Sequence, residues 1–190
     1  MKTIKILALM TMLLAMIVMM CGCLASEYKE YHYWLNDDGT GYGTIKFVNI
    51  VSQEEDEKDV SATDFSGLID DYLDGSSFED ENPHLTVTGK ELNQENGALM
   101  GQVTFTFDHF DSIGFYRFKD CDCAPVIYYM GSLSETFVKS NGTYLGEGTD
   151  FPLLIWEHGA TEFYLKTLVL DDMSNCHSLL PLWGAWKENQ

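Results

Sequence analysis

The residues with the clearest chemical potential are three cysteines and one histidine, Cys121, Cys123, Cys176 and His177. Thiolate sulfur and imidazole nitrogen are the ligands of structural zinc sites, and four such groups complete a tetrahedral site. The spacing argues against zinc, because zinc-binding cysteine pairs are usually separated by two to four residues and here one residue intervenes. It is also difficult for adjacent Cys and His side chains to point at one ion.

The alternatives to a metal site are a disulfide and unpaired thiols. An exported protein meets an oxidising compartment in which disulfides persist. A disulfide from Cys176 to Cys121 or Cys123 would close a loop of roughly fifty residues and stabilise the fold by ~4 kcal/mol. We therefore favour the disulfide, keep free thiols and a metal or redox site as alternatives, and predict no bound metal and no other cofactor.

No pattern in the chain predicts a catalytic residue. The five histidines are scattered along the sequence, and it contains no H-E-x-x-H, G-x-S-x-G, P-loop or G-x-G-x-x-G motif. The usual signatures of zinc hydrolases, serine hydrolases and nucleotide-binding enzymes are thus absent. We predict a protein that is not an enzyme.

The N-terminal stretch predicts where the protein acts. Lys2 and Lys5 precede an uncharged run from Ile6 to Met20. A basic start followed by an apolar run of this length is the pattern of a secretory signal peptide. Positive charge at the start keeps that end cytoplasmic, so the remainder of the chain faces outward.

The end of this stretch, Met20-Cys21-Gly22-Cys23, resembles the lipobox of bacterial lipoprotein precursors. In that motif a small residue directly precedes the cysteine that becomes lipidated, as Gly22 precedes Cys23, whereas Met20 stands where leucine is usual. The resemblance implies cleavage after Gly22, diacylglycerol on Cys23 and usually a further acyl chain such as palmitate on its amine.

Such lipidation would place the protein in the cell envelope. Two or more acyl chains anchor a protein stably, whereas one gives only marginal binding. The expected location is the outward side of the cytoplasmic membrane or the outer membrane. The alternatives are an uncleaved anchor, since about twenty uncharged residues can span a bilayer, and a cleaved soluble product.

Three regions follow from this interpretation. Residues 1–22 form the signal peptide, residues 23–30 the lipidated cysteine with a short polar spacer, and residues 31–190 an acidic α+β domain. The formal net charge of the chain is −19, with 30 acidic residues against 11 lysines and arginines. This charge argues against nucleic acid and anionic lipid headgroups as partners. The simplest interpretation of the negative charge is solubility. A cationic partner or bound divalent ions are the alternatives.

Hydrophobic periodicity predicts a single α+β domain with a largely antiparallel sheet. Apolar residues alternate from Leu99 to Phe107, which indicates a strand with one covered face. Residues 28–35 and 42–51 predict one hairpin, and residues 85–92 and 99–107 a second around the loop 93–97. Asn141-Gly142 predicts a third, tight hairpin.

One helix is clearly predicted, over about 64–74, and a second is a candidate at the C-terminus, over 178–187. Phe65, Leu68, Ile69 and Tyr72 follow the spacing of a helical stripe. The tryptophans of Trp183-Gly184-Ala185-Trp186 are expected to dock the terminal helix onto the core.

These observations lead to one main functional hypothesis and two alternatives. The main one is a non-enzymatic lipoprotein, held to the membrane by its lipid anchor, that binds another envelope protein or envelope component or has a structural role. The first alternative is a small-ligand carrier or sensor with a pocket of several hundred Å³ between helix and sheet. The second is a metal-dependent or hydrolytic enzyme.

Overall fold

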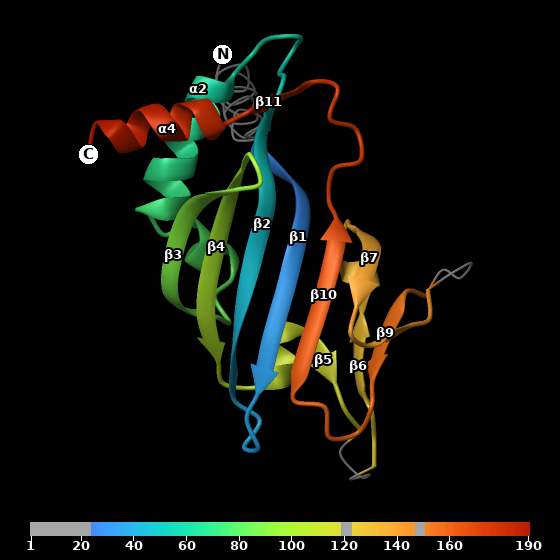
Figure 1. The fold of residues 1–190 in the computed structure, drawn as a ribbon. Coiled ribbons are helices and arrows are strands. Elements are labelled where there is room, and N and C mark those ends of the chain that lie inside the picture. The colour runs from blue at the N-terminus through green and yellow to red at the C-terminus, as the bar shows by residue number, and fades with distance from the viewer. Residues whose placement is uncertain (1–23, 119–122, 147–150) are drawn as a thin grey trace, which may run out of the picture.

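A large antiparallel sheet forms the centre of the molecule (Figure 1). The computed structural model describes residues 24–118, 123–146 and 151–190. The spatial order of the sheet is β3-β4-β2-β1-β10-β7, and β11 pairs with the end of β2. Its strands are β1 (Leu24–Leu35), β2 (Gly41–Gln53), β3 (Thr86–Glu95), β4 (Ala98–Phe107), β7 (Thr136–Ser140), β10 (Glu162–Leu168) and β11 (Cys176–Ser178).

A second, smaller antiparallel sheet packs against one end of the large sheet. Its order is β5-β6-β9-β8, and its strands are β5 (Phe115–Tyr116), β6 (Val126–Tyr129), β8 (Thr143–Tyr144) and β9 (Leu153–Trp156). In Figure 1 the helices gather at the end of the large sheet where β1 begins, and β5 and β6 lie behind its opposite end. Mostly antiparallel sheet with a few helices is the α+β class that the sequence predicts.

The helical segments are short and lie mainly between β2 and β3 and at the C-terminus. They are α2 (Ser61–Gly67), the π-helical turn η2 (Leu68–Leu73), α3 (Ser77–Glu81), the 3-10 turns η3 (Phe110–Ile113) and η4 (Met130–Ser132), and α4 (Leu180–Glu188). The stripe predicted over 64–74 is present, with Phe65, Leu68 and Ile69 buried, but the helix is divided into an α and a π segment. The C-terminal helix also forms, and its Trp183 is buried against the core.

The first predicted hairpin forms, but it begins earlier than the sequence analysis placed it. β1 starts at Leu24 and pairs with β2 from that residue onward. From Tyr28 it also pairs with β10. Residues 24–30, which the sequence analysis assigned to a polar spacer, are therefore strand, because pairing with β2, and from Tyr28 also with β10, satisfies their backbone hydrogen bonds. The turn is closed by Thr40, whose hydroxyl and backbone N–H both donate to Asp38.

The second hairpin also forms, with a tighter turn than the predicted loop 93–97. β3 continues to Glu95 and pairs there with Ala98. Only Asn96 and Gly97 remain between the strands, with φ of 51° and 81°. Asn-Gly accepts positive φ at both positions, which is the requirement of a two-residue hairpin turn.

The third predicted hairpin, at Asn141-Gly142, is wrong. The flanking strands β7 and β8 belong to different sheets, and they pair with β10 and β9 respectively. Asn141 acts through its side chain instead: its Oδ1 accepts from Trp156 Nε1 at 2.7 Å and from the Tyr164 backbone N–H at 2.8 Å. An Asn-Gly pair predicts a turn only locally, and here it marks the passage from one sheet to the other.

Two hydrophobic cores hold the layers together. The intersheet core includes Phe105, Phe115, Trp156 and Phe163, and lies between the large and small sheets. The helix core lies between α2, η2, α4 and the other end of the large sheet, with the buried members Ile50, Phe65, Leu68, Ile69, Leu99, Leu179 and Trp183. One face of the large sheet, which we call the inner face, is thus covered at both ends.

Candidate ligand-binding cavity

Between the two cores the inner face borders a cavity of about 1170 Å³. Its floor is formed by strands of the large sheet, through residues such as Tyr31, Ile45 and Val103. Its other walls come from α2, η2 and α3, and from the small sheet near Tyr128. The volume exceeds the several hundred Å³ expected for a pocket between helix and sheet, and also the usual 300–1,000 Å³ of ligand sites.

The cavity exists because the two covering layers meet different parts of the sheet. The helical stripe is only about two turns long, so it seals the sheet near Ile50 and Leu99. The small sheet seals the opposite end through Phe115 and Trp156. The stretch of inner face between them, around Phe47, is left as cavity floor.

A buried polar cluster, Glu135 with Lys29, Tyr31 and Thr167, lies at the cavity. The Glu135 carboxylate accepts from Lys29 Nζ at 2.9 Å, from Tyr31 Oη at 2.9 and 3.0 Å, and from Thr167 Oγ1 at 2.6 Å. The Glu135 side chain is 6% exposed and that of Lys29 is 27% exposed. Charge-assisted hydrogen bonds of this kind hold side chains in fixed positions.

Three neighbouring strands bring this cluster together. Lys29 and Tyr31 alternate on β1, so both point to the inner face. Thr167 lies on β10 directly opposite Lys29. Glu135 immediately precedes β7, the next strand along. The register of β1, β10 and β7 therefore places one carboxylate opposite three donors.

Burial and the nearby carboxylate also perturb two tyrosines of the cavity wall. The pKa of Tyr31 lies far above its usual value, first because the phenol is buried and then because the Glu135 charge and hydrogen bond disfavour a phenolate. Burial likewise raises the pKa of Tyr33, with a smaller effect from Tyr128. Both phenols are thus neutral hydrogen-bonding groups at physiological pH.

The helical side of the cavity is acidic. Tyr72 Oη donates to Glu81 at 2.9 Å. Burial, this bond and the charges of Glu81 and Asp71 raise the pKa of Tyr72 to about 12. Both Asp71 and Glu81 are exposed residues of the cavity wall. Two carboxylates therefore lie where the helical wall of the cavity meets solvent.

The other lysine of the wall, Lys90, is already paired. Its Nζ lies 3.0 Å from Glu79 Oε1 and also donates to the Gly75 backbone oxygen. Burial alone would raise the pKa of Glu79, but the hydrogen bonds from Lys90 and from its own backbone N–H lower the pKa below its usual value. Lys29 and Lys90 are thus both neutralised by carboxylates.

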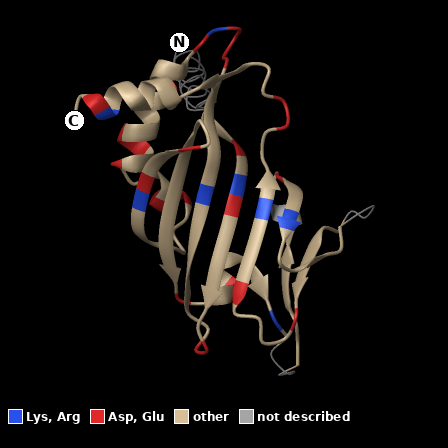
Figure 2. Cartoon of the chain, viewed as in Figure 1, with Lys and Arg blue, Asp and Glu red and all other residues tan. Residues whose placement is uncertain are grey.

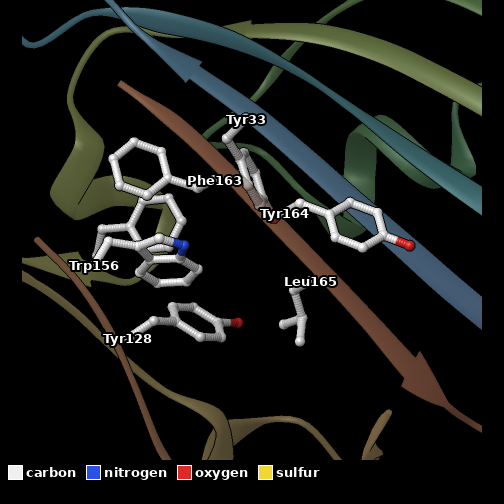
Figure 3. Close-up of a pocket in the computed structure, with 7 residues that line it drawn as sticks. Tyr33, Tyr128, Trp156, Phe163, Tyr164 and Leu165 are labelled. Carbon is white, nitrogen blue, oxygen red and sulfur yellow. The ribbon is translucent and has the colours of Figure 1, made fainter. Parts of the chain in front are cut away.

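A second, much smaller hollow lies among aromatic rings between the two sheets (Figure 3). Its volume is about 10 Å³, at the lower limit for a single water molecule. Figure 3 shows Tyr33, Tyr128, Trp156 and Phe163 around it, while the ring of Tyr164 points away from them. We interpret it as a packing gap of the intersheet core.

The cysteines and histidine singled out by the sequence do not form one site. Cys123 is disulfide-bonded, whereas Cys176 is a free thiol, so the favoured disulfide involving Cys176 is wrong. Cys176 lies in β11, beside the end of β2, where burial and then the charges of Asp172 and Glu54 raise its pKa. Cys121 and the predicted lipidation site Cys23 lie outside the described residues.

His177 has carboxylate partners of its own. Its Nε2 lies 3.0 Å from Glu54 Oε1 and its Nδ1 lies 3.7 Å from Asp59 Oδ2. Within the part of the chain that the structure describes, no group of three or more His, Cys, Asp or Glu residues is placed to hold a metal ion. The His177 contacts attach β11 to the loop that follows β2.

The sequence analysis missed the cavity cluster around Glu135. The available signal was the alternation of Lys29, Tyr31 and Tyr33, which places a lysine on the same face as two aromatic residues. Assigning residues 23–30 to a spacer concealed it. Glu135 itself, a single acid among many, carried no local signal.

Comparison of the chain with protein-family models, with curated proteins and with solved structures finds no match. In the described ranges, none of the helices combines the length and apolar character needed to cross a bilayer.

Proposed function

We propose that this chain is a lipid-anchored protein of the cell envelope that binds a small amphipathic ligand in the cavity between its helices and its large sheet. The observation that carries the proposal is the cavity of about 1170 Å³ with mostly apolar walls. Apolar cavities of this kind with a few placed polar groups are typical of ligand sites. The proposal gives the protein a binding role and no catalytic one.

The cluster around Glu135 supports a binding role because it is fixed before any ligand arrives. The carboxylate has three donors, and Thr167 is fully buried. Side chains held in this way lose little conformational freedom when a ligand binds. The cluster therefore offers an oriented polar surface beside an apolar floor.

The proposal treats residues 31–190 as one domain, together with the strand residues 24–30. The cavity supports this, because its lining draws on the large sheet, the small sheet and the helices between β2 and β3. Neither covering layer encloses the cavity without the other.

The anchor is supported by the sequence of residues 1–23. Leu24, Ala25 and Ser26 line the cavity and directly follow Cys23. Lipidation of Cys23 would hold the cavity next to the bilayer surface. Mass spectrometry of the mature N-terminus tests this: we expect a chain beginning at Cys23 and carrying acyl chains, and an unmodified Cys23 would contradict it.

The ligand-binding role is tested by filling the cavity. Ile45 lies on the cavity floor, whereas the adjacent Thr44 points to the opposite face of β2. The full chain and the variants Ile45→Trp and Thr44→Trp are purified from membranes, and small molecules bound to them are extracted and quantified by mass spectrometry. We expect a near-stoichiometric amphipathic compound that is retained by Thr44→Trp and lost from Ile45→Trp.

Thermal unfolding of each variant accompanies this measurement. If Ile45→Trp does not fold, Leu92→Phe fills the cavity from a half-exposed position on β3. Equal occupancy in folded cavity-filling and control variants would contradict the proposal, as would an empty parent chain that takes up no neutral apolar fluorophore.

A second candidate function, docking of another envelope component, is favoured by the other face of the sheet. Trp34 stacks on Tyr42 with ring centroids 5.1 Å apart, and on His32 at 4.0 Å. Tyr42 is 49% exposed. Crosslinking in intact cells tests this candidate: Trp34→Ala should lose a crosslinked partner that Ile45→Trp retains, and the same recovery from both would contradict it.

A further inference from the structure

The shape of the cavity restricts what can occupy it. The β1 residues that line it extend from Leu24 to Tyr33. At a rise of about 3.3 Å per residue, this part of the strand is about 30 Å long. A volume of about 1170 Å³ over that length gives a mean cross-section of about 40 Å². The lining also crosses β2, β4 and β3 beside β1, so the space is a broad, shallow layer over the sheet in which extended alkyl chains can lie flat against the strands.

The charge of the wall restricts the polar end of the occupant. Its two lysines are paired, Lys29 with Glu135 and Lys90 with Glu79. Four acids of the wall, Asp64, Asp71, Glu81 and Glu91, have no lysine or arginine partner among the described residues. The uncompensated charge of the wall is therefore negative.

The position of these acids gives the two ends of the cavity different roles. Asp71 and Glu81 are exposed, and both carboxylates lie close enough to the Tyr72 phenol to raise its pKa. Asp64 is 8% exposed and its Oδ2 accepts from Ser52 Oγ at 2.6 Å. A charged headgroup can stay partly hydrated beside Asp71 and Glu81, while its chain lies along β1.

From this shape and charge we infer that the cavity binds a linear alkyl-chain amphipath with a positively charged headgroup. The inference rests on the proposed binding function and names its ligand class. The chain buries its methylenes against Ile45, Phe47 and Val103, which removes apolar surface from water. The ammonium group lies beside Asp71 and Glu81, where a carboxylate headgroup would meet repulsion.

Protection of a thiol in the cavity tests this inference. Leu92→Cys places a thiol on the cavity wall, and Thr106→Cys places one on the exposed, opposite face of the sheet. Both are made in the full chain with Cys176→Ser, which removes the free native thiol of the described region. Alkylation rates by a maleimide are measured in isolated membranes with decyltrimethylammonium, decanol or decanoate, each below its micelle-forming concentration.

We expect decyltrimethylammonium to halve the alkylation rate of the L92C thiol at a concentration at least fivefold lower than decanol, and decanoate to be weakest. The T106C thiol should react at the same rate throughout. The double variant Asp71→Asn with Glu81→Gln should lose the preference for the cation over the alcohol and keep protection by the alcohol. If L92C does not fold, Val103→Cys provides the cavity thiol.

The outcomes separate the two proposals. Equal protection by all three compounds would overturn the headgroup selectivity and leave the binding function standing. Stronger protection by decanoate than by decyltrimethylammonium would also overturn the headgroup selectivity and leave the binding function standing. No protection by any compound would overturn both.

Discussion

The two faces of the large sheet carry the same types of residue with different consequences. On β1, Lys29 points to the inner face and pairs with Glu135, whereas the next residue, Glu30, points to the outer face and pairs with Lys166. Figure 2 shows lysine and acidic segments side by side across the middle of the sheet. Glu135 is 6% exposed, while the side chains of Glu30 and Lys166 keep 28% and 25% of their surface.

This difference shows that burial, rather than the number of ion pairs, decides what a charge contributes. In an exposed ion pair, each charge gives up contacts with water for a contact of similar strength with its partner. Such a pair therefore contributes only about 0–1 kcal/mol to the free energy of unfolding. Removing one partner of a buried pair leaves the other charge without compensation, which costs about 3–5 kcal/mol. The inner face therefore concentrates the stability and carries the proposed ligand-binding cavity.

The largest expected effect is on apolar packing. Phe105→Ala removes an inner-face ring that is 1% exposed and should lower the free energy of unfolding by about 3–5 kcal/mol. The adjacent outer-face variant Thr106→Ala should cost less than about 1 kcal/mol. Urea denaturation measures both, and similar losses would show that the outer face is also covered.

The second-largest effect on the free energy of unfolding is expected at the two ion pairs of β1, the buried one with Glu135 and the exposed one of Glu30. Glu135→Ala leaves Lys29, Tyr31 and Thr167 without their acceptor. Because Lys29 is partly exposed and regains some water, we expect a loss of about 3 kcal/mol. Glu30→Ala should cost at most about 1 kcal/mol.

Chemical denaturation of both variants checks this comparison. Adding Lys29→Met to a Glu135→Leu variant should recover most of the lost stability, since an apolar pair can replace a buried ion pair. Equal losses from Glu135→Ala and Glu30→Ala would contradict the distinction between the faces.

The third effect appears at alkaline pH. The pKa values of Tyr31 and Tyr33 are raised in the folded chain, so the unfolded chain loses these phenol protons first. Their contribution to stability is complete below about pH 10 and falls as the pH rises above it, by up to about 1.4 kcal/mol per pH unit for each tyrosine.

Denaturation curves between pH 8 and 11.5 test this dependence. Tyr33→Phe should reduce the loss of stability per pH unit, whereas the outer-face variant Tyr42→Phe should leave it as in the parent chain. The same slope in Tyr33→Phe and the parent would count against the buried phenol as its source.

The smallest effect concerns the exposed pair between Lys46 and Glu95. Glu95 keeps 49% of its side-chain surface exposed, so Lys46→Met should change the free energy of unfolding by less than about 0.5 kcal/mol. Any loss should vanish in 1 M NaCl, because salt screens exposed charges. A salt-insensitive loss above about 1 kcal/mol would show that this pair behaves like the inner-face one.

Local patterns in the sequence were sufficient for much of the fold. The alternation from Leu99 to Phe107 fixed which side of β4 is buried, and the spacing of Phe65, Leu68 and Ile69 fixed the face of the helix. Asn96-Gly97 specified its own turn, because positive φ suits both residues. Periodicity and turn chemistry depend on neighbours in the chain, so they can be recognised without the tertiary structure.

The tertiary structure alone decided the remaining features. Asn141-Gly142 has the same local chemistry as Asn96-Gly97, yet β7 and β8 find their partners in different sheets. Glu135 lies 106 positions from Lys29 in sequence, so their pairing depends on the register of three strands. The cavity is the space that two covering layers leave between them, and no local pattern encodes that distance. The sequence by itself thus determined the elements and their buried faces, while the packing of distant segments created the candidate site.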